Sequence, residues 1–394
     1  MEIMNGKATL GDKKISIAIM SSFVVLTSQY LVLIYFNLME TTAGSMIQLF
    51  SKLIVGFFYV VALPTVLKRN KMFFFITYFI GIVIYATNYF VFTENWIHLN
   101  DTLFPFFFTS LPTFIYIYSL EDKNILMNIM RKTSVVVFFI CLFVAILIFL
   151  ENNTVGEYSM SLSYYTLLPL IFFLNDLFNK FNIVKLFFVV VSTVVILALG
   201  SRGAILCVLI FIILKLLFQL KKLTYTKFFI YSVLAIIIIF SVFFIDDILQ
   251  LSYEFLSNNF GIKSRTLRLF QEESLHLSQR DVIYKNVLHE IAKHPIIGLG
   301  VAGDRNYAGA VYVHNILLEI IAHFGVLIGC LLLFTLLFMI IFALKTQDLT
   351  RRDLIIIWLC LGLVPLFVSS SYLIELNFWV LLGLVVQNIK FRKY

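Results

Sequence analysis

The sequence predicts an all-α polytopic membrane protein with about 12 transmembrane helices, since each span needs about 20 mostly apolar residues. Three observations lead to this fold class. The 394 residues are 61% hydrophobic and 13% charged, whereas a soluble chain carries about 25% charged residues. Apolar runs recur along nearly the whole chain. Lysines and arginines gather on alternate sides of these runs, as the positive-inside rule requires. One membrane domain, residues 1–394, is expected.

The apolar runs place helices 1–9 within residues 15–245 and helices 10–12 within residues 315–389. The expected spans are 15–36, 46–67, 72–92, 102–120, 133–150, 158–178, 184–200, 203–220, 228–245, 315–344, 354–373 and 376–389. With the amino terminus inside, most lysines and arginines fall in cytoplasmic segments, and Arg202 is the only basic residue in a short outer loop. This distribution predicts that both termini are cytoplasmic.

Residues 246–314 form the one long polar interval, and the alternation of spans places this loop on the extracytoplasmic side. Within it, Asp281–Lys293 has apolar residues at helical spacing, and Pro295 follows the end of this pattern. We therefore expect a small amphipathic helix at the outer mouth of the helix bundle. The loop also carries basic residues that suit either a solvated face or an anionic ligand, namely Lys263, Arg265 and Arg268.

Several function classes are excluded by where the residues fall. The net charge of +8 sits mostly in short loops between apolar runs, so no nucleic-acid partner is expected. The four cysteines lie inside apolar runs with neither zinc nor disulfide spacing. There is no phosphate-binding loop, no dinucleotide fingerprint and no Asp-x-Asp run in an outer loop. We therefore expect neither a cofactor nor a metal.

Arg202 stands in the run Gly200-Ser201-Arg202-Gly203, which separates two apolar half-runs. An arginine near the bilayer is costly, and such residues usually face a cavity or a partner. One interpretation is a turn residue that reaches the membrane surface. The other is an anion clamp, because the guanidinium fork matches phosphate oxygens.

Arg280 precedes Asp281 at the start of the loop helix, where free backbone N–H groups also favour anions. It could equally be a solvated helix-start arginine.

His314 and Asn315 lie at the outer end of the tenth span, with Glu319 deeper in it and His323 four residues further. Ionisable residues inside a span are functional candidates, and a histidine can act as acid or base near neutral pH. Alternatively, neighbouring helices satisfy these groups. Glu319 and His323, which can share a helix face, suit a structural role better than His314 does.

These motifs, taken in order, resemble the O-antigen ligase and polysaccharide polymerase superfamily over roughly residues 195–330. They are the Gly-Ser-Arg-Gly break, Arg280, the run from Pro295 to Gly300, and His314-Asn315 followed by Glu319 and Gly325. The chain departs from the commonest pattern at Ile316-Leu317, where an aromatic residue often follows His-Asn.

The resemblance implies a metal-independent, inverting glycosyltransferase of the GT-C class, whose donors are glycans on undecaprenyl diphosphate. It implies that Arg202 and Arg280 engage the donor diphosphate and that His314 acts near the acceptor. The residues expected to bind substrate are Ser201, Asn315, Glu319, Gly298 and Gly300.

The leading hypothesis is a polymerase of O-antigen or capsular repeat units, acting on the outer face of a bacterial cytoplasmic membrane. Its partners would be an undecaprenyl-diphosphate-linked oligosaccharide, membrane lipid, a chain-length regulator and a flippase. A ligase with lipid A core or another acceptor remains open. A flippase or transporter is a third alternative, although its charged residues should lie near the bilayer midplane.

Overall fold

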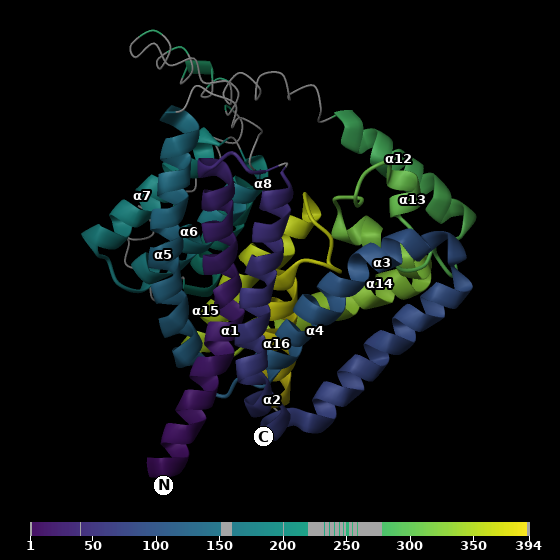
Figure 1. Ribbon diagram of the computed structural model, residues 1–394, viewed down its shortest axis with the longest axis horizontal. Helices are drawn as coiled ribbons and strands as arrows, with labels where there is room; N and C mark the ends of the chain where they lie inside the picture. The colour runs from purple at the N-terminus through teal and green to yellow at the C-terminus, as the bar shows by residue number, and fades with distance from the viewer. Residues whose placement is uncertain are drawn as a thin grey trace. The chain divides into compact units, whose positions relative to one another are not determined.

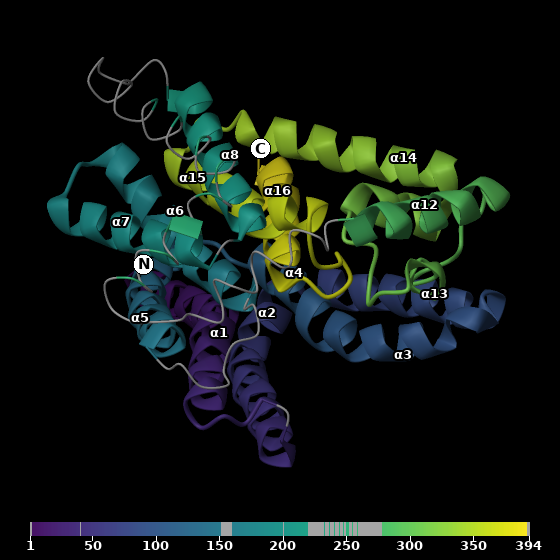
Figure 2. The same ribbon diagram turned by 90° about the horizontal axis from the view of Figure 1, so that it is seen from above.

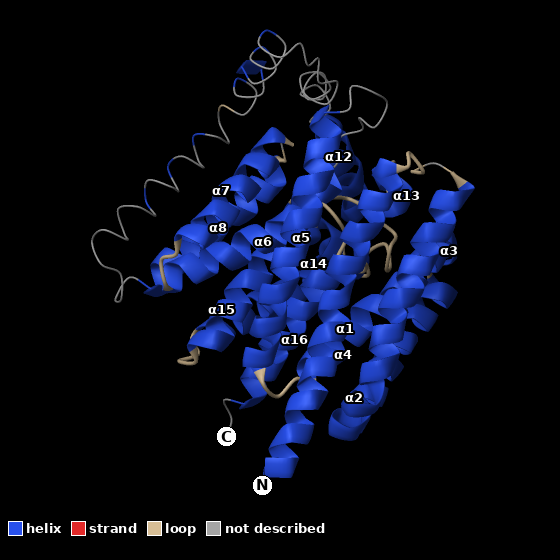
Figure 3. Cartoon of the chain, turned by 60° about the vertical axis from the view of Figure 1, so that its left-hand side comes forward, coloured by secondary structure: helices blue, strands red, loops and turns tan. Residues whose placement is uncertain are grey.

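The computed structural model describes residues 2–39, 41–150, 160–199, 201–219 and 278–391, with a few single positions between 232 and 258. All regular structure in these residues is helical, and they contain no strand (Figure 3). The all-helical class is therefore confirmed for this part of the chain. The expected ninth span, 228–245, lies mostly outside the described residues, as do the side chains of Lys263, Arg265 and Arg268.

Long apolar helices dominate the described residues. Five are long and apolar enough to cross a membrane, so the chain is a membrane protein: Thr9–Tyr35, Thr42–Val91, Lys123–Ile148, Ser161–Asn179 and Ile316–Leu344. Three shorter apolar helices accompany them. The number of 12 spans and the cytoplasmic termini stay predictions. The longer helices and the loop helix are α1 (Glu2–Tyr35), α2 (Thr42–Val91), α3 (Trp96–Pro105), α4 (Leu111–Tyr118), α5 (Lys123–Leu150), α6 (Met160–Asn179), α7 (Ile183–Ala198), α8 (Arg202–Gln219), α12 (Ser278–Lys293), α14 (Ile316–Leu344), α15 (Leu349–Trp358) and α16 (Leu376–Phe391).

The chain divides into two compact units. The first comprises Met1–Ile15, Tyr59–Lys123 and His276–Tyr394, and the second comprises Ser16–Phe58 and Asn124–Leu275. The single-domain expectation stays a prediction. Arg280 and His314 belong to the first unit, whereas Ser201 and Arg202 belong to the second.

Two predicted boundaries differ because polar residues do not always end a helix. The second and third spans join in α2, which bends at Asn70, where φ is −142° and ψ is 47°. The span predicted from residue 133 begins earlier, so Arg131 lies inside α5. Its guanidinium pairs with Asp176 at 3.3 Å, and Lys185 pairs with the same carboxylate at 2.9 Å. This pairing lets charged side chains sit at the helix ends of the second unit.

The span predicted for 354–373 ends early. After α15, a π turn at Leu359–Leu363 leads into a 3₁₀ turn, Val364–Phe367, and the chain then leaves the helix. Pro365 disfavours a continued α-helix because it lacks an N–H, and the serines that follow favour turns. The correction matters because this non-helical segment contributes Ser371 and Tyr372 to a buried polar cluster.

Helix α14 is broken near its start, and a loop packs into the break. Gly325 has a left-handed backbone with φ of 77° inside the helix. The Val326 N–H donates to the Pro295 carbonyl at 2.8 Å, and the Leu299 N–H donates to the Ala322 carbonyl at 2.7 Å. Figures 1 and 2 both show α12 alongside α14, and the two helices are in contact. The break therefore fixes residues 294–315, the site loop, onto α14.

Candidate functional site

His314 sits in the site loop between the short helix α13 (Arg305–Ala308) and α14. Its φ of 58° is left-handed, which is uncommon for a residue other than glycine. The following Asn315 is the N-cap of α14, and its side chain accepts from the Leu317 N–H at 2.9 Å. Before it, the Val313 N–H donates to Oδ2 of Asp304 at 3.2 Å. Both neighbours of His314 are thus fixed by hydrogen bonds, which hold its unusual conformation.

The imidazole of His314 is half-buried and stacks obliquely with Tyr312, their ring centroids 4.4 Å apart. Its Nδ1 atom is buried and has no hydrogen-bond partner. Burial and, second, the positive charge of Arg280 lower the pKa of His314 below its usual 6.5. The ring is therefore neutral near pH 7 and has a nitrogen able to accept a proton.

Arg280 occupies the first turn of α12, a helix that covers the segment Asp281–Lys293 and begins slightly before it. The apolar face of α12 buries Val287 and Ile291 against Leu299 and Val313 of the site loop. This packing places the half-buried Arg280 where its charge acts on His314. The charge of Arg280 thus acts on His314, and the catalytic roles of both residues stay predictions.

A polar cluster, the Asp304 cluster, includes Asp304 of the site loop and consists of the buried Asp304, Glu319, His323 and Ser371 with the half-buried Tyr372. Nε2 of His323 lies 2.7 Å from Oδ1 of Asp304, and Nδ1 lies 2.8 Å from the Tyr372 hydroxyl. Glu319 accepts hydrogen bonds from the Ser371 hydroxyl and, at 3.3 Å, from the Tyr372 N–H. The cluster ties the site loop, α14 and the segment after residue 367 together.

Asp304 connects this cluster to the site loop, because its carboxylate contacts both His323 and the Val313 N–H. Its burial opposes ionisation, but the charge of His323 and the hydrogen bond with that ring outweigh burial, so the pKa of Asp304 lies below its usual range. Burial also raises the pKa of the Tyr372 phenol well above its usual range. Asp304 is therefore the negative partner of His323, while Tyr372 stays protonated.

Asp304, Glu319 and His323 are residue types that bind metals, and their ligand atoms lie within 4.8 Å of one another. Both ring nitrogens of His323 are already engaged, however, and Nε2 also lies 3.1 Å from the Ala302 N–H. The arrangement acts as a hydrogen-bond clamp, and we assign it no metal.

Two asparagines of the first unit anchor the site loop from a different side. Oδ1 of Asn88, near the end of α2, accepts from the Val301 N–H at 2.7 Å. Asn95 donates to the Leu299 carbonyl at 2.7 Å and accepts from Asn306 at 2.7 Å. The loop that carries His314 is thus held by α2, α14 and the turn that contains Asn95.

The remaining predicted site residues fall into two groups. Gly298 and Gly300 have left-handed backbones in the site loop, and a Cβ on Gly298 would lie 2.4 Å from the Gly325 nitrogen. These glycines allow close packing, and their contact with substrate stays a prediction. In the second unit, Arg202 begins α8 and the buried Ser201 accepts from the Ala204 N–H at 3.5 Å. The approach of Arg202 to Arg280 stays a prediction.

The sequence patterns do not point to four residues of this region: Asp304, Arg305, Ser371 and Tyr372. A signal existed for the first two, because Asp304-Arg305 is a charged pair within a glycine-rich segment of an apolar chain. Ser371 and Tyr372 give no such signal, since the apolar run 354–373 predicts a membrane helix there.

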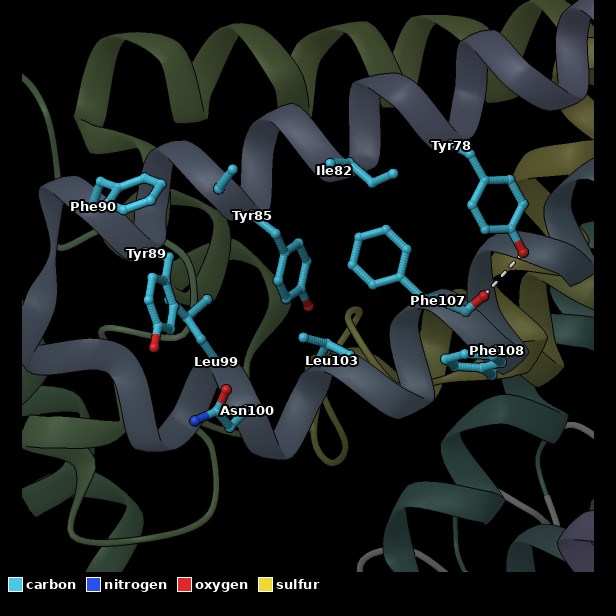
Figure 4. Close-up of a pocket in the computed structure, with 11 residues that line it drawn as sticks. Tyr78, Ile82, Tyr85, Tyr89, Phe90, Leu99, Asn100, Leu103, Phe107 and Phe108 are labelled. Atoms are coloured by element: carbon cyan, nitrogen blue, oxygen red, sulfur yellow. Dashed lines mark hydrogen bonds between the residues drawn. The ribbon is translucent and has the colours of Figure 1, made fainter.

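An apolar groove of about 490 Å³ lies between the second half of α2 and α3 with the π turn that follows it. Figure 4 shows Tyr78 and Tyr85 projecting from α2 toward the helix that carries Leu103 and Phe107. The Tyr78 hydroxyl donates to the Phe107 carbonyl at 3.0 Å. Asn88, which lies on α2 between the lining residues Ala86 and Tyr89, binds the Val301 N–H of the site loop. The groove therefore adjoins the polar site loop through α2.

Comparison with known families supports the resemblance seen in the sequence. A family model described as O-antigen ligase matches residues 187–334. This segment contains Arg202, Arg280, His314 and Glu319. Comparison with curated proteins and with solved structures gives no match. The family implies a glycosyltransferase-type membrane enzyme of the ligase or polymerase kind. Residues 187–334, less than half of the chain, are therefore similar to the O-antigen ligase family.

Proposed function

We propose that this protein is a polysaccharide polymerase. It would transfer a growing glycan from undecaprenyl diphosphate onto the next lipid-linked repeat unit, with inversion and without a metal. The observation that carries the proposal is the half-buried His314 before α14, whose Nδ1 has no hydrogen-bond partner and whose pKa is lowered by burial and by the charge of Arg280. A base for the acceptor hydroxyl thus lies beside a cation for the diphosphate.

The chemistry follows from these two groups. The acceptor hydroxyl oxygen attacks the anomeric carbon, and the bond from that carbon to the diphosphate oxygen breaks. A ring nitrogen of His314 takes the hydroxyl proton. Arg280, with Arg202 as its proposed partner, stabilises the negative charge on the departing undecaprenyl diphosphate. Attack from the side opposite the leaving group inverts the anomeric centre.

The isoprenoid chain of the donor is the occupant we propose for the groove beside Tyr85. Its lining is almost wholly apolar, which suits a hydrocarbon chain. Because Asn88, next to the lining residue Tyr89 on α2, binds the Val301 N–H of the site loop, a lipid in the groove would bring its diphosphate toward that loop. Such binding supplies proximity between the reacting groups.

The proposed location is the extracytoplasmic face of a bacterial cytoplasmic membrane, in line with the positive-inside distribution. A flippase would then supply the lipid-linked unit, and a chain-length regulator would limit the product.

The test uses full-length protein purified in detergent with an undecaprenyl-diphosphate-linked repeat unit, and measures product length. We expect a ladder of longer glycans from the native protein. Arg280→Ala should slow extension about a hundredfold or more, since an electrostatic group at the transition state contributes on that order. Lys285→Gln removes an exposed positive charge from the same helix and should leave the rate unchanged.

His314→Ala should abolish extension but leave binding of undecaprenyl diphosphate intact. Full activity of this variant would overturn the assignment of His314. The same assay separates the rivals. Transfer of a single glycan to lipid A core without growth identifies a ligase. Growth in detergent, where there are no compartments, excludes transport as the sole function.

A further inference from the structure

Arg305 is a buried cation that the proposed reaction does not use. Arg305 is 7% exposed to solvent. Its Nε and Nη2 atoms are buried and have no hydrogen-bond partner. A guanidinium holds five N–H donors in a fixed fork and stays charged. Buried polar groups are nearly always paired, so this fork calls for acceptor atoms that the described residues do not supply.

Arg305 is linked to the proposed base, His314, through the site loop that carries both residues. It directly follows Asp304, whose carboxylate holds the Val313 N–H, and Val313 precedes His314. The charge of Arg305 also reaches the carboxyls of Asp304 and Glu319 and the phenol of Tyr372. The fork is therefore part of the same loop as the proposed base.

The two nearby carboxyls do not pair with Arg305 because other groups hold them. Asp304 is bonded to His323 and to the Val313 N–H. Glu319 is bonded to Ser371 and to the Tyr372 N–H. The result is a buried site that combines unsatisfied N–H donors with carboxylate acceptors.

The charges around the Arg305 guanidinium indicate which class of ligand fits there. A diphosphate would bring further negative charge beside the buried Asp304 carboxylate, where like charges repel strongly. A sugar hydroxyl carries no charge, accepts from the guanidinium with its oxygen and donates to a carboxylate with its hydrogen. The site therefore suits a neutral polyol better than an anion.

We propose that Arg305 is a sugar-binding residue, whose Nε and Nη2 donate to oxygen atoms of a sugar at the reaction centre. Arg280 then serves the diphosphate, and the two arginines divide recognition of the lipid-linked glycan. This inference rests on the proposed function, because it takes the ligand to be a glycan on a lipid diphosphate.

The experiment measures the dissociation constants of two probes in detergent, with no turnover required. One probe is undecaprenyl diphosphate without a sugar, and the other is the undecaprenyl-diphosphate-linked repeat unit. The native protein should bind the second more tightly. Arg305→Gln should weaken binding of the repeat unit by about tenfold or more, as expected for lost hydrogen bonds to a charged group. Binding of the sugar-free probe should change less than about twofold.

Arg305→Lys keeps the charge but loses the fork, so it should also lower the preference for the sugar-bearing probe, and it serves if Arg305→Gln does not fold. Lys285→Gln is the matched control and should leave both constants unchanged. Equal weakening for both probes would make Arg305 a diphosphate clamp and overturn the proposal. An unchanged preference would also overturn it. Absence of polymer from the native protein would instead contradict the proposed function, while the ratio of the two constants still tests Arg305.

Discussion

The protonation state of His314 sets the pH dependence expected of catalysis. Burial first, and the charge of Arg280 second, lower the pKa of this ring below 6.5. A base must be neutral to act, so activity is lost only as the pH falls through the lowered pKa. We expect kcat/KM for the lipid-linked unit to hold steady from neutral pH to below about pH 6.5 before it drops, since this profile reports the free enzyme's base.

The substitution Arg280→Gln tests whether the charge of Arg280 lowers the pKa of His314. Removing the positive charge makes protonation of His314 easier, so its pKa rises and the acid limb of the residual activity moves to higher pH. The shift is partial because burial, the larger cause, remains. Lys285→Gln should leave the limb in place. An unmoved limb in Arg280→Gln would contradict the interaction between the two side chains.

Asp304 is expected to contribute strongly to the stability of the fold, because it forms a buried pair with His323. The Asp304 and His323 side chains are both 0% exposed, and breaking such a buried pair costs about 3–5 kcal/mol. Asp304→Ala should therefore lower the free energy of unfolding in detergent by about that amount. Asp304→Asn keeps an acceptor and should lose less. Equal stability of the alanine variant and the native protein would contradict the clamp.

At the scale of elements, the contact between the site loop and the break in α14 is the feature that positions the site. Gly298 has φ of 76°, and a Cβ there would meet the Gly325 nitrogen at 2.4 Å. Gly298→Ala combines backbone strain, about 1–3 kcal/mol, with a clash against backbone that cannot move freely. We expect a large fall in the melting temperature and loss of transfer activity.

Gly309→Ala is the matched control for that substitution. Gly309 also has a left-handed backbone, with φ of 61°, but nothing lies within 4 Å of its added Cβ. It should show the backbone strain alone, so its melting temperature should fall less than that of Gly298→Ala. Equal falls would argue against the close approach of the loop to α14.

At the scale of the whole molecule, the charge distribution predicts which segments face the cytoplasm. The cysteines Cys141, Cys207 and Cys360 are buried and Cys330 is half-buried, which favours labelling of introduced cysteines. Lys285→Cys on α12 should react with a membrane-impermeant maleimide on intact cells. Lys71→Cys, at the bend of α2, should react only after permeabilisation. The reverse pattern would place the site loop in the cytoplasm and contradict the proposed location.

Much of this architecture could be predicted because membrane helices leave a strong local signal. Apolar length identified the helices, and the spacing in Asp281–Lys293 identified α12 before any tertiary information. The errors arose where local signals conflict. Charged residues such as Arg131 lie inside a helix because Asp176 pairs with them, and the apolar run to residue 373 concealed a turn.

By itself, the sequence determined the membrane class and the helical content, and it predicted the roles of Arg280 and His314. These depend on composition, periodicity and short motifs, which are properties of neighbouring residues. Only the tertiary structure decided that Asp304, His323 and Tyr372 form one buried cluster and that Arg305 has unsatisfied donors. Hydrogen bonds between segments distant in the chain, and the burial that makes them necessary, depend on how the chain packs.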